Sequence, residues 1–182
     1  MFNLLKSTIE MLDKKSPYLF NLGIHISKIN DVLIVEGTDN HVALRAVLKN
    51  EKWIEKIEND TDLVIDAIFL SKILKGFKKN QDVPVEIKNK VVTINGTEIP
   101  TLCVKYPDLE RALRFCQKSN DNSTALISFH SLQKISKAGI LALSGYPTDS
   151  FLMTASDGAS FIKYEASTVD YDLIFMQAPY KK

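Results

Sequence analysis

Two stretches of the sequence share one pattern, and this internal repeat constrains the fold more than any other feature. They are LIVEGTDNHVALRAV, residues 33–47, and FLMTASDGASFIKYEA, residues 151–166. Each has an apolar run, then Thr-Asp or Ser-Asp, a turn residue, three variable positions, and an apolar residue followed by a basic one. Apolar runs on both sides of turn residues are typical of a β-hairpin. The chain therefore builds one hairpin twice, which indicates a repeated supersecondary unit.

The first unit surrounds the first hairpin. Apolar residues at helical spacing predict a helix over residues 3–14, which ends before Ser16-Pro17. Three β-rich runs follow near residues 18–29, 31–37 and 41–48, and turn residues separate them. The first unit is therefore αβββ.

The sequence predicts two further units, each made of a strand, a helix and three more strands. A polar connector over 48–61 leads to the second unit, and a polar linker over 105–123 leads to the third. Their expected elements lie at 62–67, 68–79, 83–96 and 97–102, and then at 124–129, 130–141, 150–156, 159–166 and 171–177. Repeated βαβββ units of this kind favour an α+β fold with antiparallel sheets and helices on one face.

Composition excludes several classes of function. The chain has 23 basic and 22 acidic residues, a net charge of +1, so bulk charge gives no sign of a nucleic-acid partner. Its two cysteines form neither a disulfide framework nor a metal-binding spacing. No apolar run approaches the roughly 20 residues of a membrane span, and the first residues lack the apolar core of a secretory signal. We expect a cytoplasmic protein.

The sequence predicts no catalytic site and no cofactor. It has no phosphate-binding glycine loop, no nucleophile elbow and no zinc-ligand spacing. His25, His41 and His130 show no partner pattern in the sequence, so structural roles are favoured for them. Asp39 and Asp157 precede turn residues and are better explained by turn hydrogen bonds than by paired-carboxylate chemistry.

The order of elements, the two Asp-containing hairpins and the sequence Tyr-Pro-Asp-Leu-Glu at 106–110 resemble the beta subunit of bacterial DNA polymerase III, the sliding clamp. In that family Phe usually stands where this chain has Tyr106. The resemblance implies a clamp-like domain of two units over residues 1–110 and a partial or condensed one over 111–182. Because a clamp domain holds two units, this chain resembles a condensed clamp, of the kind that a phage or mobile element would carry.

The resemblance also implies function and assembly. Clamps of this family are rings of twelve such units that enclose DNA and hold a polymerase near its template, without catalysis of their own. Three units per chain imply a homo-oligomeric ring of four copies. The implied partners are double-stranded DNA and a DNA polymerase or another replication protein.

Basic residues on the expected helices form stripes opposite the apolar faces, given about 100 degrees per residue. Lysine stripes suit phosphate contact that does not read bases, although a solvated helix face in a lysine-rich chain would look the same. We predict DNA contact by basic residues of two helices and the linker: Lys72, Lys75, Lys79, Lys134, Lys137, Arg111 and Arg114.

A partner site is implied by the resemblance alone. Family clamps take a short polymerase peptide in an apolar pocket, near which Met176 and Pro179 can be placed.

Two alternative functions stay open: an adaptor or inhibitor that binds replication proteins without forming a ring, and a single-strand-binding accessory protein. The second lacks the aromatic residues between lysines that base stacking would require.

Overall fold

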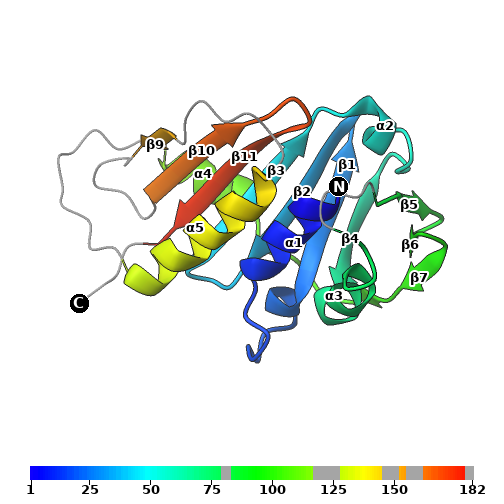
Figure 1. Ribbon diagram of the computed structural model, residues 1–182, viewed down its shortest axis with the longest axis horizontal. Helices are drawn as coiled ribbons and strands as arrows, with labels where there is room; N and C mark the ends of the chain where they lie inside the picture. The colour runs from blue at the N-terminus through cyan, green and yellow to red at the C-terminus, as the bar shows by residue number, and fades with distance from the viewer. Residues whose placement is uncertain (79–82, 117–127, 145–151, 155–161, 179–182) are drawn as a thin grey trace.

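An eight-stranded antiparallel sheet runs through the molecule (Figure 1). The structure is a computed structural model that describes residues 1–78, 83–116, 128–144, 152–154 and 162–178. The strand order is β8-β4-β1-β2-β3-β11-β10-β9. The bounds are β1 Gly23–Ile29, β2 Val32–Thr38, β3 Val42–Leu48, β4 Thr61–Asp66, β8 Thr101–Leu102, β9 Leu152–Thr154, β10 Ile162–Ser167 and β11 Tyr171–Gln177.

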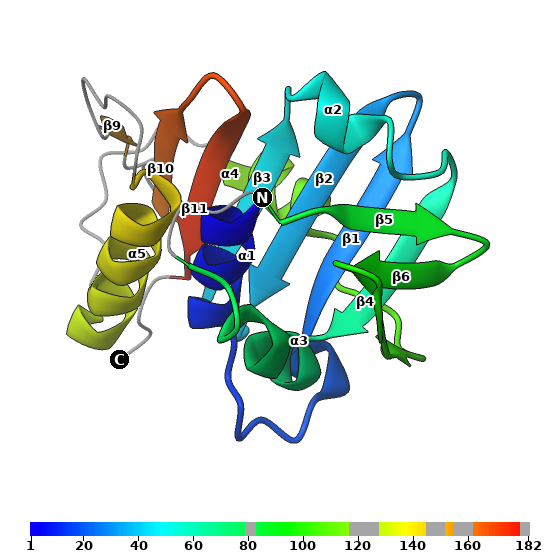
Figure 2. The ribbon, with the colours of Figure 1, turned by 45° about the vertical axis from the view of Figure 1, so that its right-hand side comes forward.

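Three helices and a small sheet cover one face of the large sheet, and a fourth helix lies on the other face (Figures 1 and 2). The covering helices are α1 (Phe2–Glu10), α3 (Ala67–Leu74) and α5 (Phe129–Ala142), and the three-stranded sheet is β5 (Val85–Lys88), β6 (Val91–Ile94) and β7 (Thr97–Ile99). The helix on the opposite face is α4 (Leu109–Cys116). Two short helices, η1 (Leu19–Leu22) and α2 (Glu51–Ile54), lie in the connections.

Local turn chemistry sets the register of the hairpins. Asn30 and Asp31 join β1 to β2 with φ angles of 48° and 63°, a conformation that Asn and Asp adopt more readily than most residues. This two-residue turn pairs His25 with Glu36 and Ile26 with Val35. Alternate residues of each strand therefore face opposite sides of the sheet.

The third unit joins the first through the pair β3 and β11. Register runs from Tyr171 opposite Leu48 to Gln177 opposite Val42. Helices α1 and α5 pack together above this junction, where the Ser7 hydroxyl donates to the Ala138 carbonyl oxygen at 2.7 Å. Small residues at the contact allow the two helix backbones to approach closely.

The two faces of the sheet have separate apolar cores. The larger core lies between the sheet and the layer of α1, α3, α5 and the small sheet. The smaller core lies under α4 and consists of Ala43, Leu109, Leu113 and Met176. Ala43 and Met176 are direct cross-strand partners, so the β3–β11 junction forms the floor beneath α4.

The predicted α+β fold with repeated units is confirmed, and the repeated stretches are the hairpins β2–β3 and β9–β10. Two local expectations were wrong. The polar linker contains α4, which lies on the opposite face of the sheet from α1, α3 and α5. Residues 97–102 are not one strand, since β7 and β8 flank Pro100 and belong to different sheets.

Two expectations are not decided by this arrangement. The expected strand over 124–129 lies mostly outside the described residues, and its last residue, Phe129, begins α5. The two-domain division at residue 110 stays a prediction, since a continuous sheet can join domains as well as lie within one. No helix in the described part of the chain is long and apolar enough to cross a membrane.

Candidate functional site

The predicted DNA-binding lysines lie on helices that cover one face of the sheet. Lys72 is in the last turn of α3, Lys75 is its C-cap residue, and both are exposed. Neither makes an ion pair within the described residues. Lys79 lies outside the described residues. The α3 end of the predicted surface is therefore available to an anionic ligand.

The lysines of α5 have acidic partners that α5 itself does not supply. Lys134 pairs with Asp39 of the β2–β3 turn and donates to the Leu12 carbonyl oxygen at 3.3 Å. Lys137 pairs with Glu10 of α1 at 2.6 Å. The Lys134 side chain is 19% exposed and that of Lys137 is 64% exposed. Lys134 therefore links α5 to the β2–β3 turn through its ion pair with Asp39, whereas the Lys137 side chain remains at the surface.

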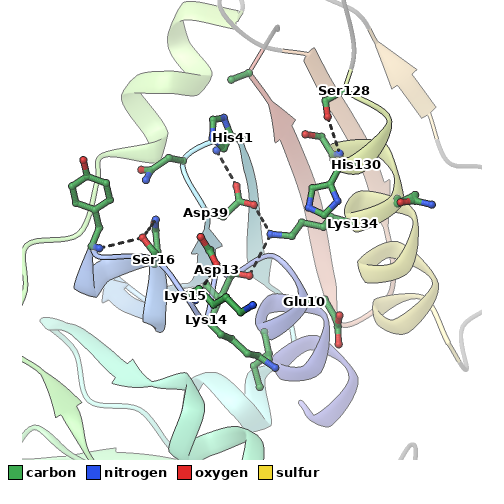
Figure 3. Close-up of a pocket in the computed structure, with 18 of the residues that line it drawn as sticks. Glu10, Asp13, Lys14, Lys15, Ser16, Asp39, His41, Ser128, His130 and Lys134 are labelled. Atoms are coloured by element: carbon green, nitrogen blue, oxygen red, sulfur yellow. Dashed lines mark hydrogen bonds and ion pairs between the residues drawn. The ribbon is translucent and has the colours of Figure 1, made fainter.

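These ion pairs border a hollow of about 1140 Å³ between α1, the β2–β3 turn and the start of α5 (Figure 3). Both charge signs line it, so it has no strong net preference for anions. Asp39 also accepts hydrogen bonds from the backbone N–H groups of His41 and Val42 at 2.9 and 2.8 Å, which fixes the turn. The charged residues that line the hollow are Glu10, Asp13, Lys14, Lys15, Asp39, Lys134 and Lys137, with His41 and His130 beside them.

Arg111 and Arg114 lie on α4 and therefore on the opposite face from the lysines (Figure 2). Asp108 begins this helix, and its carboxylate accepts the backbone N–H of Arg111 at 2.8 Å. Arg114 pairs with Glu110 at 2.6 Å, and this pair lowers the pKa of the Glu110 carboxyl. The structure does not bring the two arginines together with the lysines.

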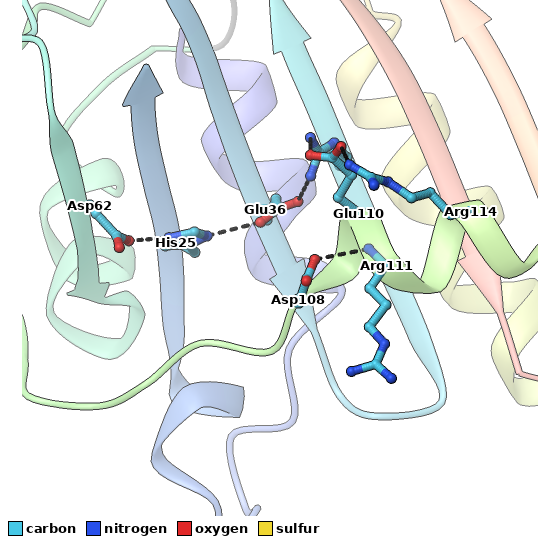
Figure 4. Close-up of polar contacts among 8 residues, drawn as sticks. His25, Glu36, Asp62, Asp108, Glu110, Arg111 and Arg114 are labelled. Carbon is cyan, nitrogen blue, oxygen red and sulfur yellow. Dashed lines mark hydrogen bonds and ion pairs between the residues drawn. The ribbon is translucent and has the colours of Figure 1, made fainter.

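Charged side chains of alternating sign cross the sheet beneath α4 (Figure 4). The His25 ring nitrogens lie 2.8 Å from carboxylate oxygens of Glu36 and Asp62. Glu36 also pairs with Arg45 at 2.5 Å, and Arg45 reaches Glu110 of α4 at 3.4 Å. The prediction that His25 has no partner pattern was wrong, because neighbouring strands supply both partners.

Met176 lies under α4 and lines a pocket of about 190 Å³. Apolar residues of β3, α4, β11 and the segment before α4 line this pocket, together with His41 of the β2–β3 turn. A cavity of this size holds one or two side chains rather than a whole small molecule. Pro179 lies outside the described residues. The apolar lining residues are Val42, Ala43, Pro107, Leu109, Ala112 and Met176.

Among the described residues, no group of three or more His, Cys, Asp or Glu side chains is arranged so that it could hold a metal ion. The features assembled by the structure are therefore a lysine-bearing helix layer on one face and an apolar pocket under a helix on the other.

Solved structures with the same fold include DNA polymerase III beta subunits. The Thermotoga maritima subunit superposes with a TM-score of 0.68 at 11% identity, the Helicobacter pylori beta clamp in complex with carprofen with 0.64 at 14%, and the Pseudomonas aeruginosa sliding clamp with 0.67 at 12%. Each match covers 100% of this chain but only 62%, 64% and 64% of the clamp. The sequence matches no family model and no curated protein. The chain therefore has the sliding-clamp fold and spans less than two thirds of the clamps' length.

Proposed function

We propose that this protein is a clamp-like processivity factor that binds duplex DNA without sequence preference and tethers a polymerase to it. The observation that carries the proposal is the likeness of the whole chain to DNA polymerase III beta subunits. Such a protein needs no chemistry of its own. Its effect is one of effective concentration, because a tethered partner rebinds DNA before it diffuses away.

The proposed DNA contact uses lysines of the helix layer. Lys72 and Lys75 are exposed on α3, and a phosphate could compete with Glu10 for the exposed ammonium of Lys137. Lys134 is more enclosed and contributes mainly to the position of α5. Arg111 and Arg114 lie on the other face, so the proposal does not place them against the same stretch of duplex.

The proposed assembly is a ring of four copies. The eight-stranded sheet ends in β8 and β9, each of which has a strand neighbour on one side only among the described residues. Pairing of such edges between copies would hide their unpaired backbone groups. Light scattering should then give a mass near four times 20.5 kDa.

The proposed polymerase site is the pocket that Met176 lines. Its apolar walls and small volume fit one or two bulky side chains of a short peptide. When peptides that carry Leu and Phe are added, the methyl NMR signals of Met176 and Leu109 should shift before those of other residues. Ala112→Phe, which fills the pocket, should abolish these shifts.

The decisive experiment compares the retention of the protein on nicked circular DNA and on the same DNA made linear. We expect longer retention on the circle. Binding of short duplexes should weaken with salt, and Lys72→Gln with Lys75→Gln should reduce the slope of log K against log salt by about 2, roughly one per lost phosphate contact. The matched control is Lys52→Gln with Lys56→Gln, two exposed lysines in and beside α2, away from α3 (Figure 1).

Equal loss from circular and linear DNA, together with a persistent monomer, would refute the ring. Such a result would favour an adaptor that uses the clamp fold to bind replication proteins. If the α3 variant has an unchanged salt slope, Lys72 and Lys75 do not contact DNA. That result would not contradict the proposed ring.

A further inference from the structure

The charge network beneath α4 contains one group that can lose its charge near neutral pH. It comprises, in spatial order and with alternating sign, Asp62, His25, Glu36, Arg45, Glu110 and Arg114. Carboxylates and guanidinium groups keep their charge across the physiological range, whereas an imidazole does not. His25 is therefore the link through which pH can act on the whole network (Figure 4).

The geometry around His25 fits the protonated ring. Both ring nitrogens lie 2.8 Å from carboxylate oxygens, Nδ1 from Glu36 and Nε2 from Asp62. Ionised carboxylates only accept hydrogen bonds, and a neutral imidazole has one N–H to donate. Only the imidazolium can therefore donate to both carboxylates at once.

The energetics of the site favour the same state. Burial lowers the pKa of His25, but hydrogen bonds to Glu36 and Asp62 and their negative charges outweigh burial and raise it above its ordinary value. A raised pKa means that the stabilisation by His25 is complete below the unfolded-state pKa and is lost as pH rises through the folded-state pKa. The network is thus tightest at mildly acidic pH.

Two contacts connect His25 to α4. The Tyr106 ring, three residues before the helix, stacks on the His25 ring with centroids 4.5 Å apart. The other connection runs through Glu36 and Arg45 to Glu110. The side chains of Glu36 and Arg45 are only 4% and 11% exposed, so solvent screens this connection weakly.

The groups that face His25 come from every element packed around it. Glu36 faces it from β2, Asp62 from β4, and Tyr106 from the segment before α4. Once His25 is neutral, it can donate to one carboxylate only, and a buried Glu36 must then rely on Arg45. Arg45 is then drawn toward Glu36, which weakens its 3.4 Å contact with Glu110. Neutral His25 also no longer places a positive charge against the Tyr106 ring.

We propose that protonation of His25 sets how firmly Tyr106 and α4 pack on the sheet, and thereby the shape of the pocket that Met176 lines. Leu109 and Ala112 of α4 form one wall of that pocket, and Ala43 and Met176 form its floor. The effect of His25 protonation on the packing of α4 is inferred from the charge network alone. Its effect on a bound peptide rests in addition on the proposed function of the pocket.

Hydrogen exchange of the α4 amides tests the proposal on the free protein between pH 5.5 and 8.5, after correction for the intrinsic pH dependence of exchange. We expect protection to fall as pH rises through the pKa of His25. The fall should be about tenfold for each unit by which that pKa differs between packed and unpacked α4. His25→Gln should remove this pH dependence, whereas His41→Gln in the β2–β3 turn, outside the charge network, should retain it.

A second variant keeps the test decisive if His25→Gln folds poorly. Asp62→Asn removes a carboxylate that raises the pKa of His25, and its side chain is 81% exposed, so the fold should tolerate the change. The transition in α4 protection should move to lower pH. Asp60→Asn, an exposed control two residues away, should leave the transition in place.

The outcomes separate this inference from the proposed function. Protection of α4 that does not change with pH, or that changes equally in His25→Gln, would overturn the inference. If α4 responds but Leu- and Phe-bearing peptides bind at neither pH 6 nor pH 8, the proposed pocket function fails and the control of α4 stands. Equal peptide affinity at both pH values, with a responding α4, would overturn the link to the pocket.

Discussion

Replacing Arg45 with Met tests the energetic role of the buried charge network most directly. The Glu36 side chain is 4% exposed, and its two charged partners are Arg45 at 2.5 Å and His25 at 2.8 Å. Removal of one partner of a buried pair costs about 3–5 kcal/mol, because the remaining charge stays buried without compensation. Since His25 remains, we expect a loss of about 3 kcal/mol at pH 8. At pH 6 the protonated His25 should make the loss smaller.

Urea unfolding followed by Trp53 fluorescence measures this loss. Trp53 is the only tryptophan of the chain and stacks against the buried Tyr171, with ring centroids 6.4 Å apart, so its emission should report unfolding. The control is Arg114→Met, whose ion pair with Glu110 is exposed, so the urea midpoint should stay nearly unchanged.

The double variant Glu36→Gln with Arg45→Met sharpens the test. It removes the buried carboxylate of this network, so it should be more stable than Arg45→Met alone. A loss below about 1 kcal/mol in Arg45→Met, or a further loss when Glu36 is also replaced, would refute the reasoning that an uncompensated Glu36 is the source of the cost.

Three further changes test the packing around the sheet by urea unfolding. Gly37→Ala should cost about 1–3 kcal/mol, because the new Cβ would lie 2.6 Å from the Thr8 Cγ2 atom and push α1 away from β2; an unchanged midpoint would contradict this close contact. Tyr106→Phe should stabilise the protein by about 1 kcal/mol, because the buried hydroxyl has no hydrogen-bond partner among the described residues. Asp39→Asn should cost about 1 kcal/mol through the lost pair with Lys134, because Asn keeps an oxygen that can accept the turn hydrogen bonds; a cost much larger than that of Lys134→Met would point to the turn instead.

Local sequence was sufficient to predict the hairpins and, in principle, the pair at the centre of the charge network. A two-residue turn at Asn30 and Asp31 requires residues with equal separation from the turn to face each other, which places His25 opposite Glu36. The helix α4 was also within reach, since Leu109, Ala112 and Leu113 have helical spacing after the N-capping side chain of Asp108.

Contacts between distant segments could not be predicted from local pattern. The stripe of lysines on α5 looks unpaired in sequence, yet Asp39 and Glu10 reach it from the first unit. The junction of β3 with β11 joins residues more than a hundred positions apart, and no turn fixes its register. Pro100 marks the point where the chain leaves one sheet for the other, which periodicity alone does not reveal.

The first repeated hairpin explains how one short sequence serves both faces of the sheet. Along β2 and β3, Val35 and Leu44 enter the core under the helix layer, while Glu36, Ala43 and Arg45 lie on the α4 face. Because side chains alternate with a period of two, a slip of one residue would place the charged pair in the apolar core and the apolar residues under α4. The Asp39 turn prevents that slip through its bonds to the backbone and to α5. The same turn therefore sets the register that both the lysine-bearing helix layer and the pocket under α4 require.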